Sequence, residues 1–147
     1  MLHRRKASRS RLMSRIMTTM KKTPKEILKS WLSRVNKGEI DGLIGMYHTD
    51  AILIPTFSSR ILKTPESIRD YFERLATREE LSVALHDKTL VTQILSEDIC
   101  TAAGIYCWRF AIDGQLLNFE ARFSYLLNLT LDSPIVHHHS SQIPRVL

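Results

Sequence analysis

Residues 104–125, GIYCWRFAIDGQLLNFEARFSY, decide the fold. Asp113-Gly114 lies between two apolar segments, which is typical of a two-residue β-hairpin turn, because both central positions of a type I′ turn need positive φ. The turn also predicts the register of the hairpin. Ile112 should face Gln115, and every further pair of partners should have residue numbers that sum to 227.

This register divides the hairpin's side chains between two faces, because cross-strand partners share a face. One face is strongly apolar and carries Tyr106, Trp108, Phe110, Phe119, Ala121, Phe123 and Tyr125. A monomer would leave such a face exposed, and exposed apolar patches of this kind mark interaction sites. We therefore expect copies of the chain to associate through Tyr106, Trp108, Phe119, Phe123 and Tyr125.

The other face of the hairpin carries Arg109, Asn118, Glu120, Arg122 and Ser124. Two arginines and a glutamate in mid-strand are unusual in a core, and if buried they must be paired or lie at a cavity. Two interpretations stay open. The groups could form a salt-bridged cluster, or they could form an anion-accepting pocket with Arg109 and Arg122 as donors and Glu120 orienting them.

Helical patterns precede the hairpin. Thr23-Pro24-Lys25-Glu26 and Thr64-Pro65-Glu66 each combine a capping residue with a proline at the first helical position. A short helix from Ile40 should end near residues 48–50, with residues 51–55 as a strand that pairs with residues 60–62. Trp31 and Tyr47 could line a pocket, although aromatic residues at helical spacing are more typical of a core.

The remaining strand segments are expected at 83–95, 98–112, 115–128 and 135–142. The last one contains His137-His138-His139, which resembles a metal site. Alternation places His137 and His139 on one face and His138 on the other, so at most two could share an ion. No cysteine or carboxylate lies near them at ligand spacing. The sequence therefore predicts no metal and no cofactor, and it places His137 or His139 at the rim of the pocket.

The charge distribution suggests a leader and one domain. Residues 1–23 hold eight basic side chains and no acidic one, whereas residues 24–147 sum to −2. We expect 1–23 to be a basic, disordered leader and 24–144 to be the domain. The leader could be a nucleic-acid or membrane-surface arm, a transit-like peptide, or an extension upstream of a true start at Met17 or Met20. Nucleic-acid binding is not favoured, because no aromatic platform accompanies the charge.

The compartment can also be predicted. No apolar run approaches the roughly 18 residues needed to cross a bilayer. Cys100 and Cys107 are seven residues apart in one strand, on opposite faces, so they cannot form a disulfide with each other there. Reduced thiols of this kind indicate a cytoplasmic protein.

Four segments carry a resemblance to a known family: Gly38–Ala51, Glu97–Arg109, Ala121–Phe123 and Ile135–Ser141. They resemble the association domain of calcium/calmodulin-dependent protein kinase II and its stand-alone, SnoaL-like bacterial relatives, within the nuclear transport factor 2-like, or cystatin-like, superfamily. The resemblance covers about residues 24–144. It implies an α+β cone, in which a curved antiparallel sheet wraps around three N-terminal helices. It also implies a pocket at the wide end and assembly through the outer face of the sheet. In the kinase domain, arginines on the central strands line the pocket, and Arg109 and Arg122 lie at matching positions.

The leading hypothesis is a non-catalytic, homo-oligomeric association-type domain, a dimer or larger. Its pocket would bind a small organic anion and would be lined by Trp31, Tyr47, Arg109, Glu120, Arg122, His137 and His139. The alternative is an isomerase, cyclase or lyase resembling SnoaL or ketosteroid isomerase, with a histidine or Glu120 as base. The catalytic aspartate of ketosteroid isomerase should fall near the end of the first strand, where this sequence has Ile54-Pro55. The sequence also shows no kinase domain. The alternative requires His139 and Glu120 to point into one cavity with Arg122.

Overall fold

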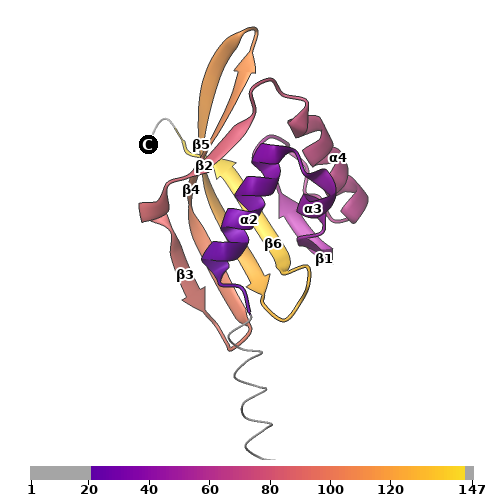
Figure 1. The fold of residues 1–147 in the computed structure, drawn as a ribbon, viewed down its shortest axis with the longest axis vertical. Coiled ribbons are helices and arrows are strands. Elements are labelled where there is room, and N and C mark those ends of the chain that lie inside the picture. Colours follow the sequence, from indigo (N-terminus) through magenta and orange to yellow (C-terminus); the bar gives the residue numbers. More distant parts are fainter. Residues whose placement is uncertain (1–20, 145–147) are drawn as a thin grey trace, which may run out of the picture.

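The computed structural model describes residues 21–144 (Figure 1). The elements in chain order are α2 (Pro24–Lys37), α3 (Ile40–Ile44), β1 (Tyr47–Ile54), α4 (Pro65–Ala76), β2 (Ser82–Leu85), the 3₁₀ turn η1 (Asp87–Thr89), β3 (Val91–Ile94), β4 (Ile99–Ile112), β5 (Gln115–Asn128) and β6 (Ile135–Gln142). The predicted leader at 1–23 lies outside the described residues except for its last three. None of the described helices is both long enough and apolar enough to span a membrane.

Both long helices begin where the sequence predicts. The side chain of Thr23 accepts a hydrogen bond from the backbone N–H of Glu26, and the backbone N–H of Thr23 donates to the Glu26 carboxylate, which completes a capping box before Pro24. Thr64 does the same with Ser67 before Pro65. These bonds satisfy backbone N–H groups that the first turn of a helix otherwise leaves free. α2 ends at Gly38, whose φ of 67° is readily adopted only by glycine.

The six strands form one sheet in the order β1-β6-β5-β4-β2, with β3 also paired to β4. All pairings are antiparallel except the parallel pair of β1 and β6. The predicted register of the long hairpin is confirmed at every position, from Ile112 opposite Gln115 to Ile99 opposite Asn128. Asp113 and Gly114 have φ values of 51° and 77°, as the two-residue turn requires.

The three helices cover one face of the curved sheet, and α2 lies across its middle strands (Figure 1). The core therefore forms on the aromatic face of the hairpin. The indole of Trp31 is fully buried and stacks on the ring of Tyr106, with 5.6 Å between centroids and 13° between planes. Aromatic side chains contribute large apolar areas, so this contact anchors α2 to the sheet.

This arrangement corrects the predicted oligomer face. Tyr106, Trp108, Phe123 and Tyr125 are at most 3% exposed, and Phe119 is partly buried against the same core. The prediction assumed that nothing in the monomer covers these side chains. Trp31 of α2 packs on Tyr106, Trp108 and Tyr125 instead, so the four buried side chains are unavailable to a second copy of the chain. Phe119 is contacted by Phe57 and stays partly exposed.

Three boundaries also differ from the prediction. α3 ends at Ile44, and Tyr47 begins β1 instead of closing a helix. Residues 60–62 form no strand, and only Leu62 pairs with β1, at Leu53. The segment 83–95 divides into β2 and β3 around η1. Both strands pair with β4. Between the two pairings, the Thr89 hydroxyl accepts a hydrogen bond from the backbone N–H of Ile105.

Candidate functional site

The residues predicted to line one pocket lie on two sides of the sheet. Trp31 and Tyr47 belong to the buried core. Arg109, Glu120 and Arg122 are exposed on the opposite, outer face. His137 and His139 lie on that outer face too, because they are the cross-strand partners of Leu126 and Ser124. The prediction of a single shared pocket is therefore wrong, because the helices cover the aromatic face and leave the ionic face to solvent.

The inner face holds a histidine that the sequence analysis did not select. His138 is 2% exposed, and its Nδ1 lies 2.8 Å from the hydroxyl of Tyr47. Its Nε2 lies 3.2 Å from the hydroxyl of Tyr106. The imidazole also stacks on Tyr125, with ring centroids 3.9 Å apart. Alternation on β6 could have identified it, since it places Val136, His138 and Ser140 on the side opposite His137 and His139.

A chain of hydrogen bonds surrounds His138. The indole N–H of Trp31 donates to the oxygen of Tyr47 at 2.9 Å, which leaves the hydroxyl proton of Tyr47 able to donate to Nδ1. In that arrangement Nε2 carries the proton of the neutral imidazole and donates to Tyr106. Burial lowers the pKa of His138 well below its ordinary value, and the neighbouring His137 and His139 lower it further. Burial raises the pKa of Tyr47, so the chain consists of neutral groups.

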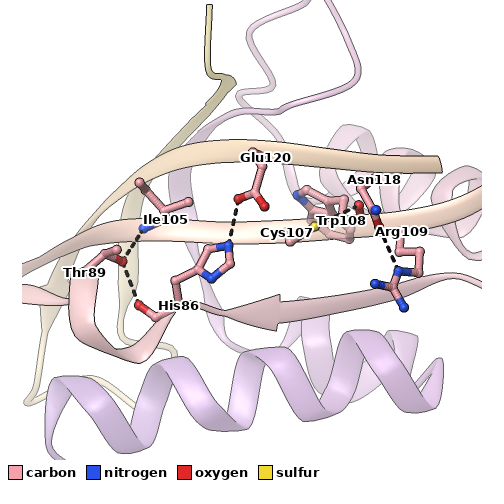
Figure 2. Close-up of polar contacts among 8 residues, drawn as sticks. All are labelled: His86, Thr89, Ile105, Cys107, Trp108, Arg109, Asn118 and Glu120. Carbon is pink, nitrogen blue, oxygen red and sulfur yellow. Dashed lines mark hydrogen bonds and ion pairs between the residues drawn. The ribbon is translucent and has the colours of Figure 1, made fainter.

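The outer face contains paired polar groups on β4 and β5 (Figure 2). Nε2 of His86, which follows β2, lies 2.8 Å from a carboxylate oxygen of Glu120. Nε of Arg109 donates to the side-chain oxygen of Asn118 at 2.8 Å. Glu120 thus pairs with His86 and with neither arginine. Within residues 21–144, Arg109 and Arg122 make no ion pair, so the predicted salt-bridged cluster does not form in one copy of the chain.

The two thiols lie on opposite faces, as predicted, and both are free. Cys100 is buried on the core side, whereas Cys107 is half-buried on the outer face beside Glu120. Burial raises the pKa of both thiols, and the carboxylate of Glu120 raises that of Cys107 further. Because the thiolate is the reactive form, this environment disfavours nucleophilic chemistry at Cys107. The described residues contain no group of three or more side chains placed to hold a metal ion.

A groove of about 450 Å³ lies between α4 and the loop that follows β1. Its lining includes three arginines: Arg60 from the loop, Arg74 from α4, and Arg78 from the turn that follows α4. A second groove of about 460 Å³ adjoins it near the tip of the β4–β5 hairpin, and the two share Phe57, Ser58, Leu75 and Arg78. These arginines are not predictable as a group from sequence, because no local pattern relates residue 60 to residues 74 and 78.

The three helices and the curved six-stranded sheet define the class of fold, an α+β cone of the nuclear transport factor 2-like, cystatin-like type. A nuclear transport factor 2-like protein with a cystatin-like fold from Novosphingobium aromaticivorans matches with a TM-score of 0.68 and 12% identity, over 95% of this chain and 88% of that one. A second protein from that organism, provisionally assigned as a scytalone dehydratase, matches with a TM-score of 0.71 and 6% identity, over 82% and 81% of the two chains. At these identities the likeness shows the fold alone.

The family is shown by the sequence itself. The sequence model of the calcium/calmodulin dependent protein kinase II association domain matches residues 21–144, so the chain belongs to this family. A structure from Xanthomonas campestris provisionally described as such an association domain is 24% identical, with a TM-score of 0.72, over 81% of this chain and 84% of that one. Among curated proteins, none matches this chain.

Proposed function

We propose that this protein is a non-catalytic association domain whose copies assemble through the outer face of the sheet. The observation that carries the proposal is that no described helix covers this face, which presents both apolar and ionic side chains. Half-buried apolar residues alternate there with ionic ones: Ile52, Ala103, Ile105 and Leu126 among Arg109, Glu120, Arg122, His137 and His139. Such a mixture is typical of protein interfaces.

The charge pattern on this face suits a second copy of the same chain. Arg122 makes no ion pair within residues 21–144, and it lies on β5 two residues from Glu120. In an interface with two-fold symmetry each contact occurs twice, so Arg122 of each copy can meet Glu120 of the other. Membership of an association-domain family supports this arrangement. The two free thiols are consistent with assembly in a reducing compartment such as the cytoplasm.

The test is the mass of the full chain in solution, measured by light scattering and native mass spectrometry. We expect a dimer or larger assembly at micromolar concentration. Arg122→Glu should weaken it at least tenfold, equivalent to about 1.4 kcal/mol, because like charges would then oppose each other. Lys29→Glu, the same charge reversal at an exposed position of α2, should leave the assembly unchanged. A monomeric wild-type chain across this concentration range would overturn the proposal.

An enzyme of the isomerase, cyclase or lyase type is less well supported. The base proposed for it was a histidine or Glu120, acting in one cavity with Arg122. His139, Glu120 and Arg122 instead lie exposed on the outer face of the sheet. The only described histidine inside the cone is His138. It is sealed among Trp31 and three tyrosines, so a substrate could reach it only if the core opened.

A further inference from the structure

The groove between α4 and the loop after β1 concentrates positive charge. Arg60, Arg74 and Arg78 line it, and Asp70 is the only carboxylate in its lining. A carboxylate oxygen of Asp70 lies 3.2 Å from Nε of Arg74 and forms an exposed ion pair with it. Within residues 21–144, Arg60 and Arg78 make no ion pair. The lining therefore sums to about two positive charges, and three guanidinium groups share one groove without enough anionic partners.

Within residues 21–144, the guanidinium of Arg78 makes no ion pair. Its guanidinium carbon lies 5.4 Å from the centroid of the Phe110 ring, a cation–π contact that positions the group. Such a contact uses the charge of the group, and the N–H donors remain able to bond to an anion. Arg78 also lines both grooves, so its donors lie where the two meet.

The adjoining groove offers an aromatic wall. The rings of Phe110 and Phe119 stack with 4.7 Å between centroids, and Phe57 meets both edge-on at 5.3 and 5.5 Å. Ile112, at the end of β4, lines the same groove and is 39% exposed. Phe110 itself is only 4% exposed, so the apolar side chains that a ligand can reach are Phe57, Phe119 and Ile112. Such side chains beside a cationic groove match a ligand with one charged end and one apolar body.

We propose that the two grooves together bind a phosphate monoester of an aromatic compound. The phosphate lies among Arg60, Arg74 and Arg78, and the ring lies against Phe57, Phe119 and Ile112. A dianion offsets the charge of the lining, whereas a monocarboxylate would leave one cation without a partner. Guanidinium forks also match phosphate oxygens in pairs of parallel hydrogen bonds. This site uses no residue of the outer sheet face, so it stands independently of the proposed self-association.

The probe is 1-naphthyl phosphate, titrated into the full chain by isothermal calorimetry at fixed ionic strength. We expect saturable binding with one site per chain. Inorganic phosphate lacks the ring and 1-naphthol lacks the charge, so each should bind at least tenfold more weakly. 1-Naphthoate, with one negative charge, should also bind less tightly. If 1-naphthoate binds as tightly as the phosphate, the assignment of a dianion is overturned.

The variants locate the site. Arg78→Gln and Arg60→Gln should each weaken binding of 1-naphthyl phosphate at least tenfold, with the thermal melting of the protein unchanged. Arg69→Gln is the control, because Arg69 lies on α4 but outside both groove linings, and its substitution removes the same charge. Equal weakening in Arg69→Gln would indicate a general charge effect and overturn the site. Absence of saturable binding by the wild-type chain up to millimolar probe would overturn it as well.

Discussion

The Nδ1 atom of His138 and the hydroxyl oxygen of Tyr47 lie 2.8 Å apart in the fully buried interior, although 91 residues separate them in the chain. This hydrogen bond connects the last strand of the sheet to the first. The bond from Trp31 to the same hydroxyl extends the connection to α2. A buried polar network stabilises a unique packing only when every member is satisfied, which makes the network sensitive to single substitutions.

Removing the imidazole should destabilise the protein strongly. His138→Leu leaves the hydroxyls of Tyr47 and Tyr106 without their partner in a buried site, which costs about 1–3 kcal/mol for each unsatisfied group. We expect a loss of roughly 2–4 kcal/mol in the free energy of unfolding, measured by urea denaturation. His139→Leu, one position along on the exposed face, should change it by less than about 0.5 kcal/mol. Equal effects of the two substitutions would contradict the assigned network.

Stability should fall on acidification because of His138. Its folded-state pKa is lowered by burial, so the unfolded chain, with an ordinary histidine pKa near 6.5, binds the proton more readily. This contribution is fully present above about pH 6.5 and is lost as the pH falls toward the folded-state pKa, by up to about 1.4 kcal/mol per pH unit. Urea midpoints between pH 8 and pH 5 measure the change. His138→Leu should flatten the profile, and an unchanged slope in this variant would refute the assignment.

Two tyrosines of the same core should respond oppositely to loss of the hydroxyl. The Tyr125 hydroxyl is buried and has no hydrogen-bond partner in the structure, so Tyr125→Phe should be neutral or stabilising by up to about 1 kcal/mol. The Tyr47 hydroxyl bonds to both Trp31 and His138, so Tyr47→Phe should cost about 1–3 kcal/mol. The free energies of unfolding of both variants are measured by chemical denaturation under identical conditions. A larger loss in Tyr125→Phe than in Tyr47→Phe would show that the partners are wrongly assigned.

The hairpin turn should favour glycine at its second central position. Gly114 has a φ of 77°, and a Cβ there would meet no atom within 4 Å, so the cost of substitution is backbone strain alone. Gly114→Ala should lower the free energy of unfolding by about 1 kcal/mol, measured by thermal denaturation. Gly114→Asn, which tolerates positive φ better, should recover part of the loss. If alanine and asparagine are equivalent, strain at this position is not the cause.

The sequence by itself determined the local features of this protein. Asp113-Gly114 specified the register of fourteen cross-strand pairs, because a two-residue turn leaves no freedom in the pairing that follows. Thr23-Pro24 and Thr64-Pro65 located two helix starts, because capping depends on residues within one turn. Alternation also separated His138 from His137 and His139 correctly. Each of these features depends on neighbours in the chain or across one turn.

Only the tertiary structure decided which face of the hairpin became the interior. Alternation defines two faces but does not say which one a helix will cover, and the stripe of α2 around Trp31 settled that in favour of the aromatic face. Arg109 and Arg122 were consequently left on the outer surface, away from Trp31 and Tyr47. The groove of Arg60, Arg74 and Arg78 likewise exists only because the loop after β1 packs beside α4. Contacts between distant segments depend on how whole helices and strands pack, and local sequence patterns do not specify that packing.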